Sequence, residues 1–114
     1  MSMYETTFIL EPGLDENRVN DEIERVSQWI RDLGGQVQDV QRWGKRRLSY
    51  EIRRKRDGIY TMIVHESHGP AVKDLERRMR LNESVLRVLT VMHVPIEPVP
   101  EVEPAAAAAD DSDE

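Results

Sequence analysis

The most constraining feature of this sequence is an apolar pattern with helical spacing in its first third. Apolar residues recur at steps of four, three, four and three, at Val19, Ile23, Val26, Ile30 and Leu33. Such steps place the side chains on one face of a helix, which needs another layer to cover it. Asp15 stands where an N-cap is expected, and Gly34-Gly35 favours termination. We therefore expect an amphipathic helix that begins just after Asp15 and ends before Gly34.

Segments typical of β-strands lie on both sides of this helix. Residues 3–10 are rich in Tyr, Thr, Phe and Ile and stop at a Glu-Pro-Gly turn sequence. A long extended stretch runs from residue 36 to about 53, and Gly44 predicts a bulge or bend within it. The Asp57-Gly58 pair is expected to reverse the chain, so that residues 59–66 return as the next strand. The two strands are predicted to form one long hairpin.

A second helix and a last strand complete the expected fold. Gly69-Pro70 begins the helix, Asn82 ends it, and residues 85–94 read as a strand. The order βαββαβ predicts an α+β, ferredoxin-like domain over residues 1–96, with a four-stranded antiparallel sheet and two helices on one face. Residues 97–114 combine spaced prolines, an alanine tract and only acidic charge, so a disordered acidic tail is expected there.

The net charge of -6 hides a division between two regions. Seven of the 22 acidic residues lie in 97–114, which leaves 15 against 16 basic residues elsewhere. Residues 42–56 concentrate positive charge, with Glu51 as the only acidic residue there. The eight basic side chains are Arg42, Lys45, Arg46, Arg47, Arg53, Arg54, Lys55 and Arg56. We predict that they bind RNA, because cations that displace the counterions of phosphates supply most nucleic-acid affinity. The alternative is that Arg46 and Arg47 only guard an edge strand against pairing with another chain and that residues 53–56 are a solvated tip.

One face of the predicted sheet is left without helices. If the turn sets the register as expected, Ile59, Thr61 and Ile63 face the helices and the open face carries apolar residues. The expected partner-binding residues there are Leu48, Tyr50, Tyr60 and Met62. Such a patch marks a protein contact or a base-stacking platform, unless the parity is reversed and these residues are core. The strand lacks the aromatic signature of an RNA-recognition motif, which disfavours a base-stacking reader of that kind.

Catalytic and metal chemistry are not expected. Cysteine is absent, and no nucleophile motif or phosphate-binding glycine loop occurs. His65 and His68 lie close together but have no further ligands at a matching spacing, so no metal and no cofactor are predicted. Trp29 and Trp43 read as packing residues. No apolar run is long enough to span a bilayer, and the first residues lack a secretory signal, so we expect a cytoplasmic protein without a membrane or small-molecule substrate.

Several blocks of the sequence resemble ribosomal protein S6 of the bacterial small subunit. The most specific is Gly44-Lys45-Arg46-Arg47-Leu48-Ser49-Tyr50, followed at a fixed distance by Asp57-Gly58-Ile59-Tyr60. Weaker blocks are Tyr4-Glu5, Glu11-Pro12-Gly13-Leu14-Asp15 and Val85-Leu86-Arg87, and the likeness runs from about Met3 to Val94. Two departures are that Glu51 replaces a common proline and that the tip 53–56 is unusually basic.

The resemblance implies a structural constituent of the small ribosomal subunit. Such a protein has a ferredoxin-like fold and binds the central domain of small-subunit ribosomal RNA together with ribosomal protein S18. Arg46 and Arg47 then become candidates for RNA or partner contact, and Tyr50 and Tyr60 for the surface that the partner covers. Two alternatives remain. An acylphosphatase-like enzyme would need an anion-binding loop where residues 11–15 are acidic, and a regulatory domain of similar topology would bind a small molecule between identical subunits.

Overall fold

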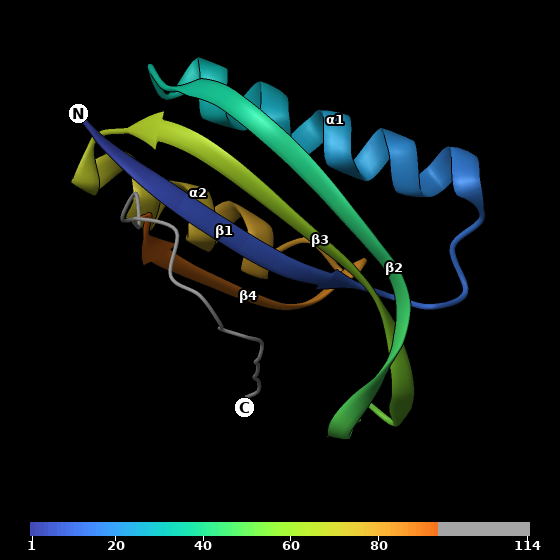
Figure 1. Cartoon of the computed structure of the whole chain (residues 1–114). Helices are drawn as coiled ribbons and strands as arrows, with labels where there is room; N and C mark the ends of the chain where they lie inside the picture. The colour runs from blue at the N-terminus through green and yellow to red at the C-terminus, as the bar shows by residue number, and fades with distance from the viewer. Residues whose placement is uncertain (94–114) are drawn as a thin grey trace, which may run out of the picture.

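A computed structural model describes residues 1–93 of the chain and has the predicted order of elements. The four strands are β1 (Ser2–Leu10), β2 (Gln36–Ile52), β3 (Lys55–Ser67) and β4 (Val85–Met92), and the two helices are α1 (Glu16–Asp32) and α2 (Gly69–Arg80). All strand pairs are antiparallel, in the order β2-β3-β1-β4. Both helices lie on the same side of the sheet (Figure 1). The predicted α+β, ferredoxin-like arrangement is therefore confirmed.

The limits of both helices follow from local chemistry. Asp15 is the N-cap of α1, and its Oδ1 accepts a hydrogen bond of 2.8 Å from the backbone N–H of Arg18. After α1 the chain reverses at Gly34, whose φ of 91° lies in the left-handed region that glycine tolerates best. Helix α2 has Pro70 in its first turn, where the missing N–H costs nothing.

The core lies between the helices and one face of the sheet. Buried apolar residues from both helices and three strands form one cluster: Phe8, Leu10, Val19, Ile23, Val26, Ile30, Ile63, Leu75, Met79, Val85 and Val88. Ile59 packs against this cluster from the side, and Thr61 is fully buried. The predicted parity of β3 is thus confirmed, since its alternate residues, beginning with Tyr60, face the other way.

The β2–β3 hairpin is long and irregular, and it extends past the other strands at one end of the sheet (Figure 1). The expected bulge is present, because the pairing register shifts between Arg42 and Gly44 and Gly44 has a φ of 81°. The register also shifts between Val37 and Asp39, and again between the pairs Arg47↔Asp57 and Ile52↔Lys55. These irregularities twist the projecting end away from the flat course of the sheet.

The predicted position of the turn is wrong. The chain reverses at Arg53 and Arg54, which have φ values of 51° and 67°, and β3 begins at Lys55. Gly58 lies inside β3, where an added Cβ would come within 2.2 Å of Ile9 Cγ2. The glycine therefore permits close packing between strands and does not form the turn.

Three further expectations concern the ends of the chain and the membrane. The predicted acidic tail, residues 97–114, lies outside the described residues, as does Val94, the expected last residue of the final strand. Within residues 1–93, neither helix is long and apolar enough to cross a membrane.

Candidate nucleic-acid interface

The basic side chains of residues 42–56 surround the projecting part of the hairpin. We call residues 42–56 the basic hairpin. Its basic side chains are Arg42, Lys45, Arg46, Arg47, Arg53, Arg54, Lys55 and Arg56. Seven of these side chains are exposed and Lys55 is partly buried. Lys45 is paired with Ile59, a residue on the helix side, whereas Arg46 is paired with Gly58 on the open side. Positive charge is therefore presented on both faces of the hairpin.

Three of the predicted RNA-binding residues form ion pairs within the chain. The closest nitrogen–oxygen distances are 2.9 Å for Arg42–Glu16, 3.6 Å for Lys55–Glu11 and 3.2 Å for Arg56–Glu51. Arg42 also donates to Asn20 Oδ1 at 2.7 Å, which ties β2 to α1. All three pairs are solvent-accessible and hence weak, so these cations can exchange partners at little cost.

The other five basic residues have no ion pair with an acidic side chain of residues 1–93. Arg46 Nε donates to the carbonyl oxygen of Trp43 at 3.4 Å, and Arg53 donates to that of Glu83 at 3.3 Å. Neither contact neutralises the guanidinium, because the acceptor is an uncharged carbonyl. Lys45, Arg47 and Arg54 have no side-chain hydrogen bond or ion pair within residues 1–93; of these, Arg54 lies in the turn itself.

The open face of the sheet carries a small apolar cluster at its hairpin end. Ile9, Leu48 and Leu86 form its buried centre, and Ile52 and Tyr60 pack against it. The predicted neighbours Leu48 and Tyr60 are thus brought together. The cluster also stiffens the base of the basic hairpin, because Leu48 anchors β2 to strands β1 and β4.

The four predicted partner-binding residues differ in how much surface they offer. Leu48 and Met62 are each only 9% exposed, Tyr60 is half-buried, and Tyr50 is 55% exposed. Arg87 donates a hydrogen bond to the Tyr50 hydroxyl and places its guanidinium carbon 5.8 Å from the centre of the ring. Of the four, Tyr50 and Tyr60 can touch another molecule, whereas Leu48 and Met62 mainly support the face.

Three exposed apolar residues of this face were not among the predicted site residues. Leu89 and Val91 of β4 are 58% and 47% exposed, and they pair with Thr7 and Glu5. Trp43 is 41% exposed, so its predicted packing role is wrong. Period-two alternation along β4 could have revealed the first two residues. The exposure of Trp43 depends on the bulge, because Trp43 lies between Arg42 and Gly44, where the pairing register shifts.

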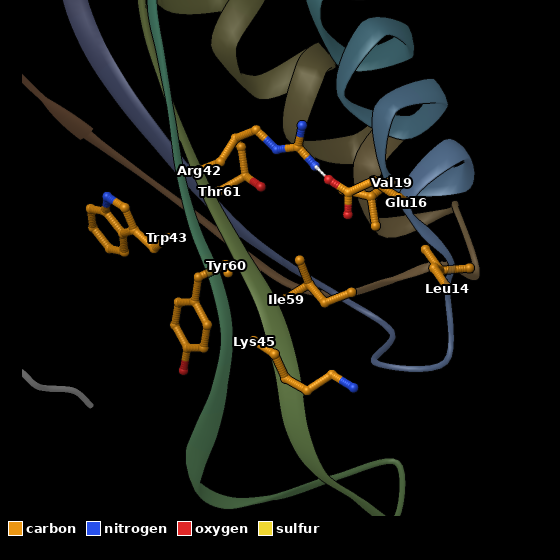
Figure 2. Close-up of a pocket in the computed structure, with 10 residues that line it drawn as sticks. Leu14, Glu16, Val19, Arg42, Trp43, Lys45, Ile59, Tyr60 and Thr61 are labelled. Atoms are coloured by element: carbon orange, nitrogen blue, oxygen red, sulfur yellow. Dashed lines mark hydrogen bonds and ion pairs between the residues drawn. The ribbon is translucent and has the colours of Figure 1, made fainter.

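A hollow of about 380 Å³ lies where the bulge of β2 approaches the start of α1. Figure 2 shows Leu14, Val19 and Ile59 on one side of the strands, with Trp43 and Tyr60 on the other. The Arg42–Glu16 ion pair spans the hollow (Figure 2). This contact links the start of α1 to the base of the basic hairpin.

The loop before α1 cannot serve as an anion cradle, as an acylphosphatase would require. The backbone N–H of Gly13 donates to Glu11 Oε1 at 3.0 Å, and the backbone N–H of Arg18 donates to Asp15 Oδ1. The amides that would bind phosphate are therefore already paired with carboxylates of the loop. Its negative charge also opposes anion binding.

The two neighbouring histidines, His65 in β3 and His68 just before α2, have different environments. His65 is fully buried, where one ring nitrogen contacts Thr6 Oγ1 at 2.8 Å and the other contacts Ser67 Oγ at 2.7 Å. Burial lowers the pKa of His65 to about 4, so the ring is neutral at pH 7. His68 is instead the exposed N-cap residue of α2. Residues 1–93 contain no group of three side chains suited to a metal ion.

Comparisons with known proteins agree on one family. The family model described as Ribosomal protein S6 matches residues 3–92. A protein of Streptomyces coelicolor named small ribosomal subunit protein bS6 is 49% identical over 87 residues, which cover 76% of this chain and 91% of that protein. The protein of the same name from Clostridium acetobutylicum is 41% identical over 91 residues, covering 80% and 96%.

A solved structure extends this similarity to the fold. The crystal structure of 30S ribosomal protein S6 from Thermotoga maritima superposes with a TM-score of 0.76 at 30% sequence identity. The match covers 81% of this chain and 87% of the Thermotoga chain. The elements that carry the basic hairpin are thus arranged as in a protein of the small subunit.

Proposed function

Since this chain belongs to the ribosomal protein S6 family, we propose that its basic hairpin binds the central domain of small-subunit ribosomal RNA while its open face holds ribosomal protein S18. The family consists of structural components of the small ribosomal subunit, a cytoplasmic complex. The chain is accordingly a ribosomal protein and not an enzyme.

The observation that carries the RNA contact is the unneutralised charge of a projecting element. Lys45, Arg47 and Arg54 are exposed and have no intramolecular partner within residues 1–93. A cation that is already solvated and unpaired can bind a phosphate without losing another contact. Each such contact also releases a condensed counterion, which favours binding at low salt.

The partner site is supported by the exposed apolar residues beside the hairpin. Tyr50, Leu89 and Val91 expose about half of their surface on the open face, and Tyr50 is linked to β4 through Arg87. Exposed apolar groups that share one face of a sheet are typical of a protein contact. A protein bound there would lie beside RNA held by the hairpin, so the two ligands could contact each other.

A filter-binding experiment tests both parts of the proposal. We expect the full chain to bind a central-domain transcript with an affinity that falls steeply between 50 and 200 mM salt. Added ribosomal protein S18 is expected to tighten binding at every salt concentration, because its contacts with the open face add to those of the hairpin. An affinity independent of salt would contradict phosphate binding, and an affinity unchanged by the partner would contradict the shared site.

A further inference from the structure

We infer that the basic hairpin is also a docking surface for the acidic end of the same chain, which competes with RNA for it. The inference rests on the proposed function, because the competition matters only if the hairpin binds RNA. Its basis is a separation of charge along the sequence. Residues 97–114 carry seven acidic side chains and no basic one, whereas residues 42–56 carry eight basic side chains and one acidic one.

The hairpin offers cations that such a segment can neutralise. Lys45, Arg47 and Arg54 lack a side-chain partner in the described part of the chain, and the ion pairs of Lys55 and Arg56 are solvent-accessible. Of the eight basic side chains elsewhere in the chain, four contact acids, namely Arg25, Arg31, Arg77 and Arg80, and the others are spread over α1, α2 and β4. The densest unpaired positive charge on the domain is therefore at the hairpin.

The length of the chain decides which carboxylates can reach it. His93 donates to the carbonyl oxygen of Met3, and Figure 1 shows the end of β4 and the tip of the hairpin at opposite sides of a domain with a longest extent of 37 Å. At about 3.3 Å per residue, the chain reaches about 13 Å from His93 to Glu97 and about 33 Å to Glu103, which is less than this extent, but up to about 56 Å to Asp110. The contact therefore belongs to the distal carboxylates Asp110, Asp111, Asp113 and Glu114.

Tethering makes even weak ion pairs effective. A covalent tether of this length gives the distal carboxylates an effective concentration of about 1 mM near the hairpin. RNA must displace them before it binds, so the acidic segment weakens binding to all RNA. An RNA site that makes many contacts with the hairpin overcomes this competition, whereas RNA that offers one or two phosphates does not. The acidic segment therefore increases discrimination against non-specific RNA.

Two variants with equal changes in charge test the inference. The distal variant carries Asp110→Asn, Asp111→Asn and Asp113→Asn, and the proximal control carries Glu97→Gln, Glu101→Gln and Glu103→Gln. In NMR spectra of the full chain without RNA, we expect the distal variant to shift the amide signals of Arg47 and Arg54. At 50 mM salt it should bind the central-domain transcript about threefold more tightly than the natural chain. The proximal control should change both measurements much less.

The outcomes separate this inference from the proposed function. Equal effects of the two variants would show a general charge effect and overturn the contact, as would unshifted hairpin signals in the distal variant. Shifts that grow with protein concentration would indicate a second copy as the occupant, which also overturns it. Shifted signals with unchanged RNA affinity would support the contact and contradict the RNA role of the hairpin instead.

Discussion

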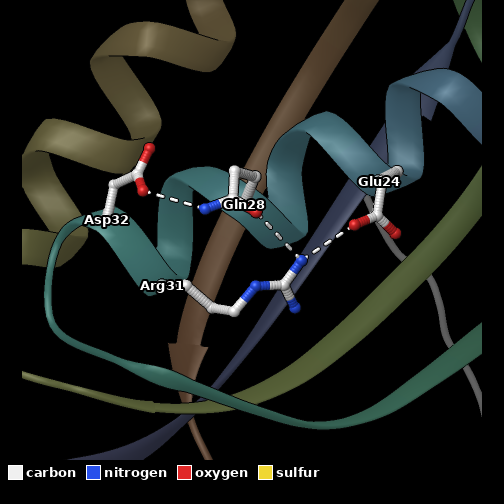
Figure 3. Close-up of polar contacts among 4 residues, drawn as sticks. All are labelled: Glu24, Gln28, Arg31 and Asp32. Carbon is white, nitrogen blue, oxygen red and sulfur yellow. Dashed lines mark hydrogen bonds and ion pairs between the residues drawn. The ribbon is translucent and has the colours of Figure 1, made fainter.

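The basic hairpin and the outer face of α1 are both rich in charge, but they use it differently. On α1, Arg31 donates to Glu24 Oε2 at 2.8 Å and to Gln28 at 3.4 Å, and Gln28 in turn donates to Asp32 (Figure 3). On the hairpin, Arg47 and Arg54 have no such partner within residues 1–93. On α1 these charged side chains pair with one another, whereas on the hairpin several cations have no partner and can bind another molecule.

This difference separates charge that maintains the fold from charge that serves a ligand. A helix surface gains a few tenths of a kcal/mol from each pair at suitable spacing, and water can solvate the rest. Exposed arginines on a strand that have no acidic partner contribute little to stability. The fold therefore does not account for the sequence Lys45-Arg46-Arg47, and its charge is available to a polyanion.

Charge reversal on the hairpin should break this contrast most strongly. We expect Arg46→Glu with Arg47→Glu to weaken binding of the central-domain transcript by about 100-fold, because two phosphate contacts become repulsive. The control, Lys73→Glu with Arg77→Glu on the exposed surface of α2, changes the net charge equally and should alter the affinity by less than about threefold. Filter binding at one salt concentration measures both variants.

Thermal unfolding completes that experiment. Both double variants should unfold within a few degrees of the natural chain, since all four side chains are exposed. If the hairpin variant binds RNA and assembles into the subunit as the natural chain does, its arginines act only as guards of the β2 edge.

The elements predicted best are those fixed by local signals. Helix α1 was predicted from its periodicity and its Asp15 cap, and the bulge from Gly44. The turn was misplaced because Asp57-Gly58 resembles a hairpin turn, while Gly58 is required by the approach of Ile9, a residue far away in sequence. Arg53 and Arg54 adopt left-handed conformations that no local pattern of arginines predicts.

The sequence located the two candidate surfaces but not the exposure of their residues. The density of basic residues located the hairpin, and the parity of the strands located the open face. Exposure depended on tertiary packing, which buries Leu48 against Ile9 and Leu86 and leaves Leu89 open. A sequence can show which residues share a face, but neighbouring strands decide which of them remain accessible.

The interior provides a second test of the contrast between satisfied and unsatisfied polar groups. His65 is neutral and contacts two hydroxyls, and its pKa in the folded state is about 4 instead of 6.5. Because the unfolded chain binds the proton more tightly, this stability is complete above pH 6.5 and is lost as the pH falls toward 4. We expect the free energy of unfolding in urea to fall by about 2 kcal/mol between pH 7 and pH 4.5.

Two histidine variants assign that pH dependence. His68→Gln removes the exposed N-cap histidine of α2 and should leave the loss unchanged. His65→Gln cannot titrate, so most of the loss between pH 7 and pH 4.5 should disappear in this variant. An NMR titration in which His65 shows an ordinary pKa near 6.5 would refute burial as the cause.

Neutral substitutions provide the finest test, because removing a paired charge should change stability alone and removing an unpaired charge should change RNA affinity alone. Arg31→Gln breaks the pair with Glu24 and should lower the free energy of unfolding by about 0.5 kcal/mol without changing RNA affinity. Arg47→Gln removes a cation that has no partner within residues 1–93, so stability should stay the same while RNA affinity falls about fivefold. Urea unfolding and filter binding on the same samples distinguish the variants. If Arg47→Gln lowered stability and left binding intact, Arg47 would have a role in the fold, and unpaired charge could no longer be taken as the mark of the RNA-binding surface.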